Sequence, residues 1–260
     1  MRTKTLSVRY VMSISPPGFS AGYTDSPAVF RGDKEFGRIL VRPQSTIRMM
    51  TERGYIQKLA SDAHDTVDLL APGRKREREQ RVCAAFLRCL GVDFSTDELT
   101  APASDPPDVA FRDAKFEVMI VLDEGRRMHA DWKAQASRLD AAEKMEDLLE
   151  PYRPTVPMAL AELVDLITAK LAEKASHYGS EVSSELDALV YVNLRGRHLD
   201  PRFRAEVPAG LKSQGWRSVC VLFPPYSLVL LAVPEAPNFL REWEGATRLR
   251  CQDPDAMFEL

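Results

Sequence analysis

Two acidic residues in the stretch DPPDVAFRDAKFEVMIV, residues 105–121, have the type and spacing for metal chemistry. Asp108 and Glu117 lie in two short segments with the alternating apolar pattern of β-strands. With Arg112 and Asp113 as a two-residue turn, Asp108 faces Glu117 on the same side of a hairpin. Opposed carboxylates repel unless a cation lies between them, and Mg²⁺ binds one or two carboxylates while keeping several waters. The spacing predicts a metal site, with ordinary strand-edge charges as the alternative.

The register of this hairpin decides between the two interpretations. A three-residue loop would shift the pairing by one residue and place the two acids on opposite faces. The alternation favours the two-residue turn. In that register Phe116, Val118, Ile120 and Leu122 point into a core, and Met119 shares the face of Glu117.

A third carboxylate lies in a predicted helix upstream. The segment RKREREQRVCAAFLRCLG, residues 74–91, has an apolar stripe through Val82 and Phe86, and Glu79 lies on the same face. A carboxylate at the edge of such a stripe usually only solvates the end of the stripe. A role at the metal site requires the fold to bring Glu79 to Asp108.

The other predicted elements must position these acids. The segment 186–194 is nearly all apolar, as expected of a strand buried on both faces. The order of elements predicts an α/β fold with a mixed sheet. The predicted helices are 51–70, 74–91, 123–149, 158–178 and a short one near 238–244, and the predicted strands are 108–111, 115–122, 186–194, 216–223 and 226–233.

Charge and composition restrict the partners and the cellular compartment that this chain can have. Residues 1–49 hold eight Lys/Arg and three Asp/Glu, which leaves 27 basic and 35 acidic residues in the rest of the chain. A nucleic-acid partner would therefore need local basic clusters and a metal ion to offset phosphate charge. No apolar run reaches the ~18 residues of a membrane span. The four cysteines form no CxxC pair and suggest neither zinc nor a disulfide framework, so we expect a cytoplasmic protein.

The stretch DPPDVAF…FEVMIVLDEGRRMHADWKA resembles DUF1780, a bacterial family of uncharacterised proteins described as endonucleases. The resemblance continues through EDLLEPY, LDALVYVNLRGRHLDP and QGWRSVCVLFPPYSLVLLAVPEAPNFLRE. The family in turn resembles PD-(D/E)xK nucleases, which implies a restriction-endonuclease-like mixed sheet flanked by helices. The active site of those nucleases consists of an acid on a leading helix, an Asp on one strand and the sequence (D/E)-x-K on the next strand. These positions fall on Glu79, Asp108 and Glu117-Val118-Met119.

The resemblance implies a metal-dependent endonuclease that hydrolyses nucleic-acid phosphodiester bonds. Asp108, Glu117 and Glu79 would be both the catalytic acids and the ligands of Mg²⁺ or Mn²⁺. Met119 replaces the motif lysine, which orients water and offsets developing negative charge. The activity is therefore expected to be weakened or lost, and the alternative is a nuclease fold that only binds partners.

Basic residues after the second strand are candidates to replace that lysine. Arg126, Arg127 and Lys133 are predicted to bind phosphate, and His129 is predicted to move a proton near neutral pH. The alternative is that this charged helix start is a solvated face. Lys115 is another candidate to replace the lysine. A separate basic group, Arg195, Arg197 and His198, is a candidate contact for a nucleic-acid backbone, with an ordinary loop as the alternative.

The resemblance begins near Met50, so residues 50–260 are predicted to form a single endonuclease-like domain. Residues 1–49 are rich in turn-forming residues and show little periodicity. We expect them to be a disordered tail or the product of a start codon placed too early, with a transit peptide as the alternative.

Overall fold

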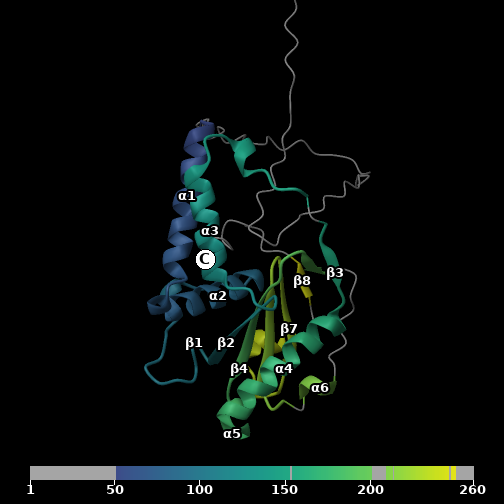
Figure 1. The fold of residues 1–260 in the computed structure, drawn as a ribbon. Helices are drawn as coiled ribbons and strands as arrows, with labels where there is room; N and C mark the ends of the chain where they lie inside the picture. Colours follow the sequence, from purple (N-terminus) through teal and green to yellow (C-terminus); the bar gives the residue numbers. More distant parts are fainter. Residues whose placement is uncertain (1–50, 153, 201–208, 213, 246, 250–260) are drawn as a thin grey trace, which may run out of the picture.

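The computed structural model describes residues 51–152, 154–200, 209–212, 214–245 and 247–249. Its centre is a six-stranded mixed sheet with strand order β1-β2-β4-β6-β7-β8 (Figure 1). The predicted α/β class with a mixed sheet flanked by helices is confirmed, whereas the predicted tail at 1–49 lies outside the described residues. The strands of this sheet are β1 (Val109–Phe111), β2 (Ala114–Leu122), β4 (Asp187–Asn193), β6 (Ser218–Phe223), β7 (Tyr226–Ala232) and β8 (Thr247–Leu249).

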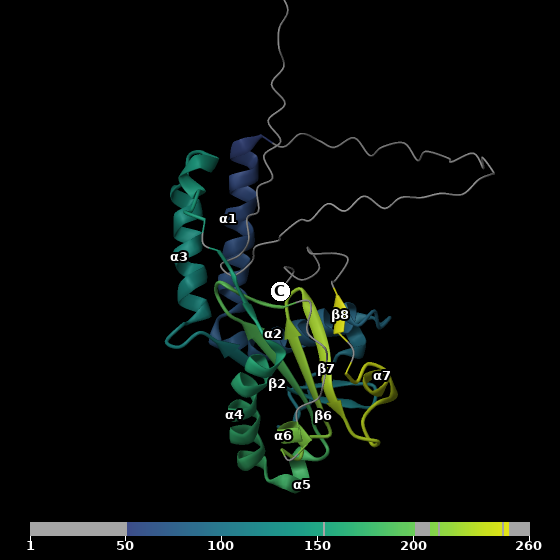
Figure 2. The same cartoon turned by 90° about the vertical axis from the view of Figure 1, so that its right-hand side faces the viewer.

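Helices cover both faces of this sheet (Figure 2). A second, two-stranded parallel sheet joins β3 (Val156–Met158) to β5 (Arg197–Leu199). Among the described residues, no helix is long and apolar enough to cross a bilayer. The helices are α1 (Glu52–Leu69), α2 (Lys75–Cys89), α3 (Met128–Ala141), α4 (Leu160–Tyr178) and the short α5 (Ser180–Ser183), α6 (Ala209–Lys212) and α7 (Asn238–Arg241).

Strand β2 separates two apolar cores. Phe116 and Val118 pack in the core that contains the apolar face of α2. Met119 and Val121 pack in the core that contains the apolar face of α4. This division follows from the period-2 alternation of a strand, in which successive side chains point to opposite faces. Glu117 therefore points toward the α4 side of the sheet.

The connections place α4 across the strands that carry the acids. Strands β2 and β4 are parallel, with Glu117 beside Ala188. Parallel neighbours require a crossover connection, and here that connection contains α3 and α4. Helix α4 buries Leu163, Ile167 and Leu171 against the sheet. This packing brings the C-terminal half of α4 over the middle of β2.

Helices α1 and α3 lie side by side and extend away from the sheet as an arm (Figures 1 and 2). The predicted helix at 123–149 is shorter than expected, because α3 begins only at Met128 and ends at Ala141. Gly125 has a φ of 73°, outside the helical region, and the chain turns there before the helix begins. After Ala141 the backbone at Ala142 is extended, with φ −76° and ψ 128°.

A buried ion pair fixes the start of the central strands. Asp187, at the first position of β4, accepts hydrogen bonds from Ser218 Oγ at 2.8 Å and from the backbone N–H of Lys115 at 2.9 Å. The guanidinium of Arg217 donates to the same carboxylate and to the carbonyl of Asp113 at 3.0 Å. These bonds tie the β1–β2 turn to β4 and β6, so they hold the hairpin in place.

The cysteines depart from the expectation drawn from their spacing. Cys83 and Cys220 are free and fully buried. Cys89 is disulfide-bonded, although the spacing of the cysteines suggested no disulfide framework. Spacing along the chain reveals short-range motifs such as CxxC, but a disulfide depends on which cysteines the fold brings together.

Candidate metal centre

The hairpin has the register that the two-residue turn predicts. Val109 pairs with Phe116, Ala110 with Lys115 and Phe111 with Ala114. Asp108 immediately precedes the first paired residue of β1. Its Oδ2 accepts the backbone N–H of Val118 at 3.0 Å, at the point where β1 no longer pairs with β2. The carboxylate of Asp108 is therefore fixed beside the strand that carries Glu117.

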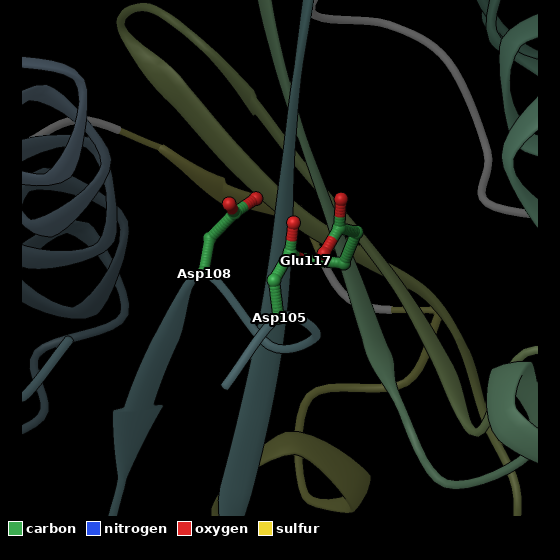
Figure 3. Close-up of side chains that lie close together, drawn as sticks. All are labelled: Asp105, Asp108 and Glu117. Atoms are coloured by element: carbon green, nitrogen blue, oxygen red, sulfur yellow. The ribbon is translucent and has the colours of Figure 1, made fainter. Parts of the chain in front are cut away.

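Three carboxylates gather at this end of β1. Ligand oxygens of Asp105, Asp108 and Glu117 all lie within 4.8 Å of one another (Figure 3). Asp105 is exposed, whereas Asp108 and Glu117 lie in the interior, with only 6% and 1% of their side chains accessible. This group could hold a metal ion, because each acid offers a hard oxygen ligand.

One carboxylate oxygen of Glu117 accepts hydrogen bonds, and the other has no hydrogen-bond partner. Its Oε1 accepts hydrogen bonds from Lys174 Nζ at 2.6 Å and from the hydroxyl of Tyr178 at 2.9 Å. Its Oε2 is buried and has no hydrogen-bond partner. An unpaired buried carboxylate oxygen is costly, and an ion that binds it would remove the cost. Burial raises the pKa of Glu117, the bond from Lys174 opposes that rise, and the charge of Asp108 adds to it.

An ammonium group lies beside the acids although Met119 holds the motif position. Lys174 reaches Glu117 from α4, and the Met119 side chain is buried in the apolar core under the same helix. Burial opposes the charge of Lys174, but the hydrogen bond and charge of Glu117 outweigh it and raise its pKa. Burial and the Glu117 carboxylate raise the pKa of Tyr178 to about 12. Both groups are therefore protonated donors to Glu117 at neutral pH.

A second lysine connects Asp108 to Glu79. Lys75 Nζ lies 3.0 Å from Asp108 Oδ1 and 3.2 Å from Glu79 Oε1. Burial and the negative charge of Asp108 raise the pKa of Glu79 to about 7, although Lys75 opposes the rise. The fold thus brings Glu79 to Asp108 from the α2 side. Glu79 is linked to the carboxylate group of Asp105, Asp108 and Glu117 through Asp108 and Lys75.

Glu79 is expected to make stability fall as the pH rises. Its pKa is about 7 in the folded chain, against 4.5 for an ordinary glutamate carboxyl. The folded state therefore binds more protons between these values, and the stability present below pH 4.5 is lost as the pH rises through 7.

Denaturant unfolding of the wild type and Glu79→Gln at pH 4.5 and pH 8 measures this effect. Glutamine resembles the protonated carboxyl, so the two proteins should match at low pH and the variant should be the more stable at pH 8. Equal stability at both pH values would contradict the predicted burial of charge. Glu77→Gln is the matched control, because Glu77 lies on the same helix but pairs with Arg74 and Arg81 at the surface.

A cavity of about 210 Å³ opens beside Glu79, between α2 and β2. Ile120 was expected in the core, but it is 39% exposed and forms part of this cavity wall. Arg78 also faces the cavity, and its guanidinium donates to the carbonyls of Leu69 and Ala71. The cavity therefore combines cationic and apolar groups next to the acids. Its lining residues are Lys75, Arg78, Glu79, Val82, Val118 and Ile120.

The basic residues predicted after β2 lie elsewhere. Arg126 donates hydrogen bonds to the carboxylate of Asp131 at 2.7 Å and to the carbonyl of Asn193 at 2.7 Å. Arg127, His129 and Lys133 follow the end of β2, which is about 17 Å along the strand from Glu117 at ~3.3 Å per residue. In the part of the chain that the structure describes, none of the four forms an ion pair or hydrogen bond with Asp105, Asp108 or Glu117.

Three of the other basic candidates have acidic partners of their own. Lys115 pairs with Glu185 at 2.9 Å. Arg195 pairs with Asp131 at 3.1 Å, and Arg197 pairs with Glu162. His198 is half-buried in β5, which pairs with β3 in the two-stranded sheet.

Sequence reasoning missed four residues at this centre: Asp105, Lys75, Lys174 and Tyr178. A signal existed for Lys174, because it lies three residues after Leu171 and so continues the apolar stripe of α4. A lysine on a buried stripe needs an acidic partner. A signal also existed for Lys75, which lies four residues before Glu79 on one helix face.

Fold and site together define an α/β protein with an acidic centre on a β-hairpin. The model of the family described as "Putative endonuclease, protein of unknown function (DUF1780)" matches residues 51–253. The chain belongs to this family, and the resemblance seen in its sequence is confirmed.

A solved structure from Pseudomonas aeruginosa, described as a protein of unknown function of the monooxygenase superfamily, is also similar. The two chains are 31% identical with a TM-score of 0.56, and the match covers 80% of this chain and 99% of the other. No curated protein matches the chain.

Proposed function

We propose that this protein is a metal-dependent phosphodiesterase that cleaves nucleic acid, with a restriction-endonuclease-like core. The observation that carries the proposal is the state of Glu117. One of its oxygens is held by the ammonium of Lys174, and the other is buried and unpaired beside Asp105 and Asp108. The endonuclease description of the family supports the same reaction class.

The arrangement of elements supports the nuclease-like layout. Glu79 lies on a helix that precedes the hairpin, Asp108 leads into its first strand, and Glu117 lies on its second. These are the three positions at which the PD-(D/E)xK pattern requires acids. The pattern also has a lysine two residues after the second acid. Met119 holds that position here, and Lys174 from α4 lies beside Glu117 instead.

The donor set fits Mg²⁺ or Mn²⁺. The group consists of carboxylate oxygens, which suit these hard cations. A divalent cation bound there would lower the pKa of a water molecule and neutralise phosphate charge. Asp108 and Glu117 would hold the ion from the interior, and Asp105 would complete the set from the surface.

The two lysines supply the positive charge that the acidic chain lacks overall. Lys174 orients the Glu117 carboxylate and would stabilise the negative charge that develops on the phosphate. Lys75 and Arg78 face the cavity on the α2 side, where the phosphate backbone of a nucleic acid would enter. Preorganised charges of this kind act most strongly where charge develops in the transition state.

A second candidate is a nuclease fold that has lost catalysis and only binds a partner. The buried Met119 at the motif position favours it. It predicts nucleic-acid binding that survives EDTA and Asp108→Asn. A non-haem iron monooxygenase, one chemistry within the class named for the similar Pseudomonas protein, fits these ligands less well. Non-haem iron oxygenases typically use two histidines and one carboxylate, whereas the ligand group among the described residues consists of three acids.

Nicking of supercoiled plasmid by purified protein tests the proposed reaction. Cleavage should require Mg²⁺ or Mn²⁺, stop with EDTA, and fall by at least about 10²-fold in Asp108→Asn, because the variant loses a charged ligand. Asparagine keeps an oxygen that can accept the Val118 N–H, so the hairpin should stay folded. Asp113→Asn, in the exposed turn of the same hairpin, is the matched control.

Two results would count against the proposal. The first is the absence of cleavage of double-stranded or single-stranded DNA or RNA with either ion. The second is cleavage that Asp108→Asn leaves unchanged, because the activity would then come from a contaminant or from another site.

A further inference from the structure

Lys75 occupies a position between two buried acids. Its Nζ lies 3.0 Å from Asp108 Oδ1 and 3.2 Å from Glu79 Oε1, so one ammonium bridges the two carboxylates. The lysine side chain is 59% exposed, whereas those of Asp108 and Glu79 are 6% and 8% exposed. A largely exposed lysine thus places its positive charge between two acids that lie in the interior.

Asp108 divides its two oxygens between different partners. Its Oδ1 binds Lys75, and its Oδ2 accepts the Val118 N–H. Asp108 belongs to the group formed with Asp105 and Glu117, and Lys75 also bridges it to Glu79, which is not part of that group. Asp108 is therefore shared between two adjacent places for a cation. The first is the group of three acids, and the second is the Asp108–Glu79 pair that Lys75 bridges.

We infer that the ammonium of Lys75 takes the place of a second metal ion. The wild type would bind one divalent cation, at Asp105, Asp108 and Glu117, and Lys75 would act as the second, permanent cation between Asp108 and Glu79. This inference rests on the proposed function for the first ion only. A pair of carboxylates that shares one cation would hold a divalent ion once the ammonium is removed.

The position of Lys75 in the cavity wall suggests a role for its ammonium group. Lys75 lines the cavity of about 210 Å³ together with Arg78 and Glu79. The Arg78 guanidinium already donates hydrogen bonds to the carbonyls of Leu69 and Ala71. The side chain of Lys75 is long and exposed, so its ammonium is the better placed of the two to contact a phosphate in the cavity. In two-metal sites the second ion stabilises one of the reacting oxygens of the phosphate. Here Lys75 would supply that charge.

Counting bound Mn²⁺ by electron paramagnetic resonance and calorimetric titration tests the inference without measuring activity. The wild type should bind one Mn²⁺ per chain, and Lys75→Ala should bind two. The double variant Lys75→Ala/Glu79→Gln should return to one, because the vacated pair has lost a ligand. Arg76→Ala is the matched control, since it removes one exposed positive charge from the same helix, and it should bind one ion.

The outcomes separate this inference from the proposed function. A wild type that binds no Mn²⁺ overturns the first metal site and with it the proposed function. A wild type that binds one ion while Lys75→Ala also binds one leaves the proposed function intact and overturns the role of Lys75. Two ions in the wild type would overturn the inference as well, because Lys75 would not exclude the second ion.

Discussion

Glu117→Gln is expected to reduce metal-dependent cleavage by about 10³-fold, the rate equivalent of about 4 kcal/mol. Glutamine has nearly the same shape and can still accept hydrogen bonds from Lys174 and Tyr178, but it removes the negative charge that faces Asp105 and Asp108. The affinity for Mn²⁺ should fall together with the rate. Titration with Mn²⁺ and plasmid nicking at saturating metal measure the two effects separately.

The same substitution should leave the fold intact. Burial raises the pKa of Glu117, which means that its negative charge destabilises the folded state. A neutral amide at this position avoids that loss of stability. We therefore expect a melting temperature equal to or above that of the wild type. Glu173→Gln, an exposed acid on α4 that pairs with Lys170, is the control and should change neither metal binding nor cleavage. Unchanged Mn²⁺ affinity in Glu117→Gln would contradict the proposed ligand set.

Lys174→Met is expected to reduce cleavage by about 10²–10³-fold, the loss typical for removing one strong donor from a reacting centre. Methionine is similar in length, so the packing of α4 should be kept while the charge is lost. Mn²⁺ should still bind, because no ligand is removed, and it should bind at least as tightly without the competing ammonium. This combination of lost rate and retained metal distinguishes Lys174 from the metal ligands.

Adding Met119→Lys to Lys174→Met tests whether the ammonium has moved between elements. Met119 lies two residues after Glu117 on the same face of β2, under α4. A lysine there would place the ammonium where the family pattern has it, so we expect part of the lost cleavage to return. Lys170→Met, one turn earlier on α4, should cleave as the wild type does. A Lys174→Met protein with full activity would show that Lys174 has only a structural role.

The local features of this centre follow from the pattern of residue types along the chain. Alternation along residues 116–122 predicts which side chains face each core, and the hairpin register follows from a two-residue turn at Arg112 and Asp113. Register is strongly specified because a slip of one residue would turn every apolar side chain to the wrong face. The position of Asp108 beside Glu117 was therefore predictable. The family resemblance added Glu79, which the structure links to Asp108 through Lys75.

The cations that pair with these acids depend instead on how the helices pack on the sheet. Lys174 is 57 residues from Glu117 in sequence, and the two meet because α4 crosses the sheet over β2. Arg126 is close to the hairpin in sequence, but β2 carries it away and Asp131 binds it. Helical and strand periodicity determine which face a side chain occupies, whereas the packing of one element on another determines what that face meets. The lysine absent from the motif is thus supplied by a different element, at a position that spacing along the chain does not encode.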